Sequence, residues 1–298
     1  MRFSIWPNSA RTWAQVHELT DWAQAQNWYG VWLADHYMPN TGTTEVADGA
    51  MNECWAYLGA LAATTSTLRF GPLVAPTSVH HPAILANRAA TLDQISGGRF
   101  VLGLGAGWQI NEHAAYGIEL PDAGPRVSRF EEAIQIVRSL LDVPRTTFEG
   151  EYYRITDAPC EPHPTGPVPI VVGSAGPRMM RIVARYAQEW NCWGRPEITA
   201  ERAAGFDQAC EQVGRDPATV HRSTQALVVF TDGGRHEPRA DSVRAISGTP
   251  EQIAERIREY AAQGFSEFIV PDFPHLETAG QRFEHYQRFA AEVVPLLA

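Results

Sequence analysis

The sequence contains no lysine, and all 24 of its basic side chains are arginine. A chain without lysine cannot form the Schiff base of an aldolase or of a pyridoxal-phosphate enzyme. It also lacks the Gly-Lys-Ser/Thr motif of P-loop nucleotide-binding proteins. Positive charge is scarce too, because 34 acidic residues give a net charge of −10. Such a chain has no field that attracts nucleic acid or an anionic membrane, so we expect a small-molecule partner.

Cysteines and long apolar runs are also few. The four cysteines lie too far apart for a zinc ribbon or a CxxC redox pair: Cys54, Cys160, Cys192 and Cys210. His80 and His81 are neighbours without the spacing of a helical zinc pair, and no HExxH or GxSxG motif is present. We therefore predict no metal. No run approaches the roughly 20 apolar residues of a membrane span, and no signal sequence opens the chain, so we expect a cytoplasmic protein.

Short β-branched or aromatic runs alternate with longer amphipathic stretches, which is the pattern of βα units around a parallel sheet. Eight strands are predicted, at 2–6, 30–35, 68–75, 99–105, 168–173, 189–193, 221–231 and 267–271. Helices are predicted at 12–27, 52–66, 82–96, 126–142, 176–188, 199–214, 249–263 and 279–296. Eight repeats favour an α/β fold of the (β/α)8 TIM-barrel type over a doubly wound open sheet. We expect one barrel domain over residues 1–298.

Three intervals are longer than a barrel requires, at 37–51, 145–165 and 232–248. Loops that follow strands lie at the catalytic end of a barrel, so the first and third are expected to shape a substrate pocket. The stretch 145–165 follows a helix. It should therefore lie at the opposite end of the barrel unless it folds back.

A carboxylate and an imidazole, Asp35 and His36, follow each other at the end of the second predicted strand. Adjacent residues of a strand point to opposite faces, so one can enter the barrel mouth while the other orients it. A histidine in this place can act as an acid, a base or a hydrogen-bond donor to a bound ring. The alternative is a purely structural Asp-His pair.

A glycine-rich turn, residues 103–107, follows the fourth predicted strand. It does not open the long helix of a dinucleotide-binding motif, and we expect its glycines instead to let the backbone approach a flat ring. Gly105 is a candidate contact of such a ring, and Asn111 a candidate amide partner. Trp6, Trp108 and Trp193, each at or just beyond a strand end, are candidate walls of a pocket for an aromatic ligand.

A second glycine-bearing turn joins the fifth predicted strand to a helix. Its candidate ligand-binding residues are Gly173, Ala175, Gly176, Pro177 and Arg178. Proline in the first helical turn, free N–H groups, the helix dipole and an arginine together suit a phosphate. An ordinary βα turn would have a similar sequence.

Together these segments resemble the luciferase-like monooxygenase superfamily, and in particular its coenzyme F420-dependent oxidoreductases. The most specific stretches are 32–36, 68–74, 81–82 with 89–93, and 95–100 leading into 103–108. The resemblance runs over the whole chain. It implies a TIM barrel that binds a flavin or deazaflavin at the C-terminal ends of its strands, with the cofactor phosphate near Gly176 and Pro177.

The resemblance also implies roles for single residues. Asp35 and His36 would lie beside the deazaflavin, and Asn111 would contact the ring. Leu73 and Val74 would form a bulge behind the ring, joined by a cis peptide bond. Some F420 dehydrogenases have a glutamate where this chain has Trp108, so a sugar-phosphate dehydrogenase is not expected and His36 remains the proton-transfer candidate.

The function implied is an F420-dependent oxidoreductase that transfers a hydride between the deazaflavin and a small organic substrate. The Asp35-His36 pair and a composition typical of GC-rich coding favour F420. The alternatives are an FMN-dependent monooxygenase and a non-catalytic flavin-binding protein. Relatives usually pair through helices on the side of the barrel, so a homodimer involving 52–66 and 82–96 is expected.

Overall fold

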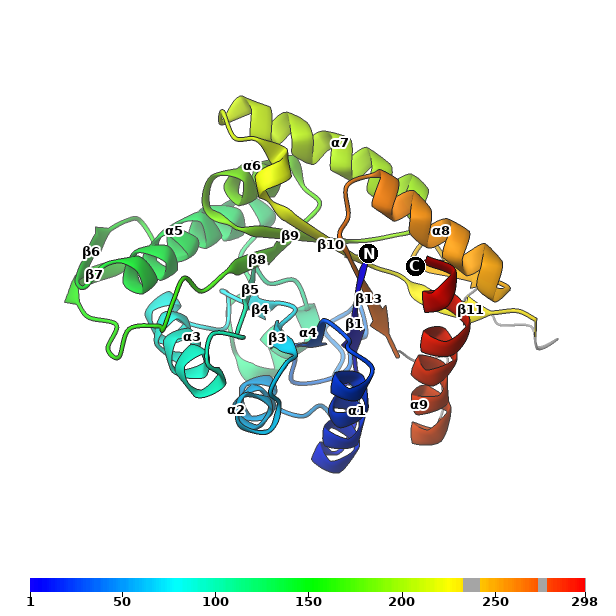
Figure 1. Cartoon of the computed structure of the whole chain (residues 1–298). Helices are drawn as coiled ribbons and strands as arrows, with labels where there is room; N and C mark the ends of the chain where they lie inside the picture. The colour runs from blue at the N-terminus through cyan, green and yellow to red at the C-terminus, as the bar shows by residue number, and fades with distance from the viewer. Residues whose placement is uncertain (233–241, 273–277, 298) are drawn as a thin grey trace.

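The chain folds into a barrel of parallel strands surrounded by helices (Figure 1). The computed structural model describes residues 1–232, 242–272 and 278–297. Its main sheet has nine strands in the order β3-β2-β1-β13-β10-β9-β8-β5-β4. A bridge between Phe70 and Phe100 joins β3 to the residues leading into β5 and closes the barrel. The predicted TIM-barrel fold is therefore confirmed.

Eight barrel strands result, because β3 and β4 are two pieces of one strand. The strands are β1 (Arg2–Trp6), β2 (Gly30–Leu33), β3 (Arg69–Pro72) with β4 (Ala75–Pro76), β5 (Leu102–Gly105), β8 (Ile170–Gly173), β9 (Glu189–Trp193), β10 (His221–Gln225) and β13 (Glu267–Pro271). The peptide bond between Leu73 and Val74, which separates β3 from β4, is cis as predicted.

The helices cover the outside of the barrel and agree closely with the predicted ones. They are α1 (Trp13–Ala25), α2 (Cys54–Thr64), α3 (Pro82–Ser96), α5 (Ala123–Asp142), α6 (Pro177–Tyr186), α7 (Pro196–Gln212), α8 (Pro250–Ala262) and α9 (Ala279–Arg288). The threonine before α1, α8 and α9 forms a capping box in each case. Within the described parts of the chain, every helix is too short or too polar to cross a membrane.

Two apolar cores hold the barrel together. The larger lies between the sheet and the helices and includes Leu19, Phe130 and Phe206, each almost fully buried. The smaller fills the barrel interior with Trp6, Trp32, Leu73, Val101, Val171 and Ile269. Because the interior is filled, a ligand can enter only at the rim, where Val74 and Trp193 pack on this core.

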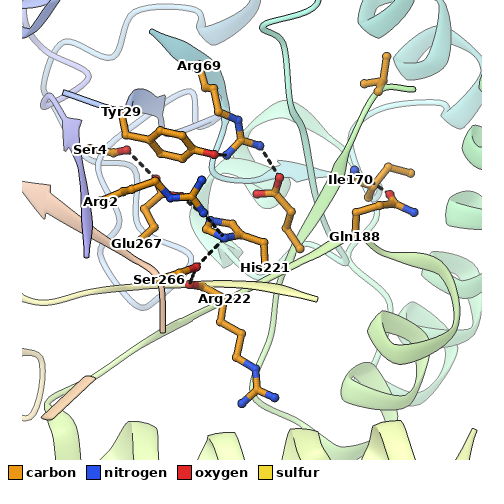
Figure 2. Close-up of polar contacts among 12 residues, drawn as sticks. Arg2, Ser4, Tyr29, Arg69, Ile170, Gln188, His221, Arg222, Ser266 and Glu267 are labelled. Atoms are coloured by element: carbon orange, nitrogen blue, oxygen red, sulfur yellow. Dashed lines mark hydrogen bonds and ion pairs between the residues drawn. The ribbon is translucent and has the colours of Figure 1, made fainter. Parts of the chain in front are cut away.

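Charged side chains fill the opposite end of the barrel, where the strands begin (Figure 2). Oε1 of Glu267 accepts hydrogen bonds from Ser4 Oγ at 2.6 Å and Trp32 Nε1 at 2.8 Å. Its Oε2 accepts one from Nε2 of His221 at 2.9 Å. Arg69 forms an ion pair with Glu189, so the buried carboxylates have cationic or hydrogen-bonding partners. We call Arg69, Glu189, His221 and Glu267 the basal cluster.

Three features differ from the sequence predictions. The predicted strand 221–231 is wrong as one element, because the barrel strand ends at Gln225 and β11 (Leu227–Phe230) pairs with β12 (Ala245–Gly248) in a separate sheet. A short helix, α4 (Ile110–Tyr116), was missed. Residues 145–165 contain a hairpin, β6 (Thr146–Glu149) and β7 (Arg154–Ala158).

The hairpin folds back along the outside of the barrel. Tyr153, between β6 and β7, donates from its hydroxyl to the carbonyl of Thr77 at 3.4 Å, just beyond β4. The same hydroxyl accepts from Nε of Arg129 in the first half of α5. This segment therefore reaches toward the C-terminal ends of the strands. Most of the third long interval, residues 233–241, lies outside the described residues.

Candidate active site

A cavity of about 230 Å³ lies at the C-terminal ends of the strands. It is lined by His36, Val74, Pro76, Gly105, Ala106, Gly107, Trp108, Glu112, Arg126, Val127, Gly173, Ser174, Ala175 and Met179. Six of the predicted site residues are in this set: His36, Val74, Gly105, Trp108, Gly173 and Ala175. The cavity is where a TIM barrel places its active site.

His36 is held by a buried carboxylate. Nδ1 of His36 lies 2.9 Å from Oε1 of Glu112, whose side chain is 2% exposed. The other oxygen of Glu112 accepts from the backbone N–H of Tyr37 at 2.9 Å. Because the carboxylate takes the hydrogen on Nδ1, Nε2 of His36 is left to exchange a proton with a ligand. The rings of His36 and Trp108 are nearly perpendicular, with 5.4 Å between their centroids.

Asp35 points away from this cavity. Its Oδ2 accepts hydrogen bonds from Nε1 of Trp55 at 3.0 Å and from Nε2 of His80 at 2.8 Å. Trp55 belongs to α2, and His80 lies just before α3, so both partners belong to or adjoin the helices that surround the barrel. The two residues of the predicted pair therefore have different roles. His36 faces the cavity, while Asp35 fixes the end of β2 to the surrounding helices.

Glycines form the floor of the cavity around Val74. A Cβ atom at Gly105 would lie 2.6 Å from Cγ2 of Val74, and one at Gly173 would lie 3.4 Å from its Cγ1. Only glycine at position 105 leaves room for the valine side chain. Leu73, predicted beside Val74 as a cofactor contact, instead belongs to the interior core.

The short helix α4 contributes Glu112 to one wall of the cavity, and side-chain hydrogen bonds hold this helix in place. Gln109 and Asn111 donate from their side-chain amides to the carbonyls of Met38 and Pro39, each at 2.8 Å. Asn111 is fully buried and does not line the cavity, so the structure does not bring it to the predicted ring contact. Its contact with Pro39 instead ties α4 to the segment after His36, which keeps Glu112 opposite the imidazole.

The start of α6 borders the cavity, but Arg178 is turned away from it. Gly176 caps this helix without a side-chain hydrogen bond, and Pro177 is its first residue. The guanidinium of Arg178 donates to the Gly124 carbonyl at 3.1 Å and to Ser128 Oγ at 2.8 Å. Arg178 therefore joins the first turns of α6 and α5. Gly176, Pro177 and Arg178 do not line the cavity, whereas Ser174 and Ala175 do.

The three predicted tryptophans occupy different places. Trp108 is 55% exposed at the mouth of the cavity, and Trp6 is almost fully buried. The rings of Trp6 and Trp193 lie 5.3 Å apart on top of the interior core. Trp6 and Trp193 thus form a neighbouring aromatic surface at the barrel mouth, outside the cavity itself.

Two charged residues of the cavity were missed from the sequence, Glu112 and Arg126. Glu112 follows the glycine-rich turn by five residues, but nothing in the sequence shows that it pairs with His36. Arg126 lies inside a predicted helix, where an arginine is normally on the solvated face. The absence of lysine was the one available signal, because it makes every arginine near a predicted anion site a candidate.

The comparison with known proteins agrees with this geometry. The family model of luciferase-like monooxygenases matches residues 1–236. The chain belongs to this family. Among relatives of this luciferase-like protein, an F420-dependent glucose-6-phosphate dehydrogenase of Beutenbergia cavernae is 30% identical, over 92% of this chain and 90% of the relative. The F420-dependent hydroxymycolic acid dehydrogenase of Mycobacterium tuberculosis is also 30% identical, over 74% of this chain and 61% of its own length.

Solved structures show the same barrel. An F420-dependent secondary alcohol dehydrogenase in complex with an F420-acetone adduct superposes with a TM-score of 0.84 at 18% identity. The superposition covers 100% of this chain and 99% of that one. The EDTA monooxygenase of Chelativorans has the same luciferase-like fold, with a TM-score of 0.79 at 17% identity over 100% of this chain and 93% of that one.

Proposed function

We propose that this luciferase-like protein is an F420-dependent oxidoreductase that transfers a hydride between the deazaflavin and a small organic substrate. The observation that carries the proposal is the pairing of His36 with buried Glu112 at the edge of a cavity whose floor is Val74 between two glycines. The identity of the cofactor is inferred from the F420-dependent relatives. An FMN-dependent monooxygenase is the second candidate, because monooxygenases share the barrel.

The cavity residues fit a flat, phosphorylated ring cofactor. Glycine at position 105 leaves the floor open to a ring, and the buried Oγ of Ser174 has no hydrogen-bond partner in the described structure. Val74 and Gly105 would support the ring, while Ser174 and the start of α6 would meet the polar side chain and phosphate. When bound, a deazaflavin accepts or donates a hydride and does not activate oxygen.

The protein's own part in the reaction is to orient substrate and to move a proton. In the oxidation of an alcohol, Nε2 of His36 accepts the hydroxyl proton as the C–H bond breaks, and Glu112 stabilises the imidazolium. In the reverse direction the same nitrogen donates. Trp108 packs against the His36 ring and shields it from water on that side.

The substrate is proposed to differ from that of the glucose-6-phosphate dehydrogenases. Position 108 is tryptophan, which can neither accept nor donate a proton in the way a glutamate does. A small alcohol or carbonyl compound suits the His36 site better.

This proposal is tested by an anaerobic panel of alcohols, aldehydes and ketones, following deazaflavin absorbance in both directions. We expect turnover with F420 that needs no oxygen. Oxygen consumption with reduced FMN, together with no reaction with F420, would establish the monooxygenase alternative. Binding of either cofactor without turnover of any compound would favour the non-catalytic alternative.

We further propose a cytoplasmic homodimer consisting of one barrel domain per chain. Five of the apolar residues that suggested an interface in α2 and α3 are instead buried in the core between the sheet and the helices: Trp55, Leu58, Leu61, Leu85 and Leu92. Ile84 and Ile95 are 53% and 52% exposed on α3 and support an interface there. Light scattering at micromolar concentration should give twice the chain mass, and a monomer would contradict the dimer.

Replacing Gly105 with alanine should weaken ring binding. The new Cβ would lie 2.6 Å from Cγ2 of Val74, so Val74 must shift into the space of the ring. We expect about a 5- to 100-fold higher Kd for F420, the range that 1–3 kcal/mol of overpacking gives. Gly59→Ala is the control, because no atom lies within 4 Å of its new Cβ. Equal Kd values for the two variants would show that the ring does not rest on Val74.

A further inference from the structure

We propose that Arg126 is the cation that binds the phosphate of the cofactor, a role that was predicted for Arg178. The proposal rests on the proposed function and adds a residue to it. Arg126 is the one arginine among the described residues that line the cavity. The chain has no lysine, so Arg126 is the one permanently charged cation among the described residues that line this cavity.

The other arginines near the cavity already have partners. Arg178 is bound to the first turn of α5 and lies 3.6 Å from Glu131. Arg129 donates to the hydroxyl of Tyr153, and Arg185 also lies 3.6 Å from Glu131. Among the described residues, by contrast, no hydrogen bond or ion pair joins the guanidinium of Arg126 to any side chain or carbonyl. Its five N–H donors are therefore available to a ligand.

The surroundings of Arg126 favour an anion. Arg126 lies near the beginning of α5, where a cation is unfavourable to the helix dipole unless an anion compensates it. Neither α5 nor α6 has an acidic residue in its first turn. Ser174 lines the same cavity, and its buried Oγ has no hydrogen-bond partner in the described structure, so it is a candidate second donor. Arg126, Ser174 and the start of α6 thus converge on one place.

Carboxylates nearby do not neutralise Arg126. Glu112, across the cavity, is bound to His36 and to the backbone of Tyr37. Asp122 lies beside Arg126 in an adjoining groove of about 520 Å³, which also includes Trp108, but forms no ion pair with it. The groove and the cavity share Trp108 and Arg126. A phosphate bound to Arg126 would thus lie where the cavity opens. The ring of the cofactor would lie inside the cavity, and the part of the cofactor beyond the phosphate would point toward solvent.

The test compares two ligands and three variants by quenching of tryptophan fluorescence. The ligands are F420 and the deazaflavin nucleoside that lacks the phosphate. Arg126→Gln should raise the Kd of F420 about 10- to 100-fold, the effect of losing a charge-assisted hydrogen bond, and leave that of the nucleoside unchanged. Arg126→Lys should fall between. Arg181→Gln, which removes an exposed arginine of α6, should change neither Kd.

Unchanged nucleoside binding also shows that the Arg126→Gln variant is folded. Equal losses for both ligands, or no loss for either, would overturn the assignment of the phosphate to Arg126. A higher KM for an anionic substrate with an unchanged Kd for F420 would also overturn it, since the anion would then belong to the substrate. If the wild-type protein binds neither ligand, the proposed function itself has failed.

Discussion

Replacement of His36 by alanine should lower kcat by about 10²- to 10⁴-fold, the usual contribution of a positioned general acid or base. The Kd of F420 should change little, because the proposed task of His36 is to move a proton. His17→Ala is a suitable control, since His17 is a half-exposed histidine of α1 that pairs with Asp21. Steady-state kinetics and a cofactor titration on the same preparations measure both quantities. Unchanged turnover would remove His36 from the mechanism.

Glu112 should act through His36. Glu112→Gln keeps the shape of the side chain but removes the charge that stabilises the imidazolium at 2.9 Å. We expect a smaller loss in kcat than for His36→Ala and a displacement of the pH–rate profile, with KM little changed. A loss of kcat without any displacement of the profile would indicate a purely structural contact.

Replacement of Glu267 in the basal cluster should strongly destabilise the barrel. Glu267→Gln leaves Nε2–H of His221 and one side of Arg69 without the carboxylate that faces them. Removing one partner of a buried charged pair costs about 3–5 kcal/mol in the free energy of unfolding. Urea denaturation at neutral pH measures the loss. Glu201→Gln, on the exposed face of α7, is the matched control.

The same carboxylate should make stability depend on pH. Burial alone would raise the pKa of Glu267, but the hydrogen bond and charge of His221, the charge of Arg69 and the Ser4 hydroxyl together lower it below 4.5. Its contribution to stability is therefore present above that value and is lost as the pH falls through the lowered folded pKa. The wild type should lose more stability than Glu267→Gln across this range. Parallel curves would exclude the basal cluster as the cause.

The barrel could be predicted because its strands and helices carry local signals. Runs such as 168–173 and 267–271 are short, apolar and bounded by turn residues, and Thr249 with Pro250 is a recognisable helix start. The strand 221–231 was wrong because Leu227 to Phe230 keep the composition of a strand while the chain leaves the barrel. Composition does not encode which neighbour a strand selects.

The site could be predicted only where a residue's place in the chain decides which way it faces. His36 and Val74 follow barrel strands directly, so their position at the rim follows from the fold. Arg126 and Arg178 both lie at the start of helices, and tertiary packing determines which of them turns to the cavity. Glu112 belongs to a short helix whose position depends on contacts with Met38 and Pro39, which are distant in sequence.

An equilibrium titration of the purified protein with F420 and with FMN tests the central claim most directly. The account predicts that F420 binds with a lower Kd than FMN and that Gly105→Ala weakens it. Tight binding of FMN together with no detectable binding of F420 would contradict the deazaflavin site and leave the flavin monooxygenase as the function of this cavity.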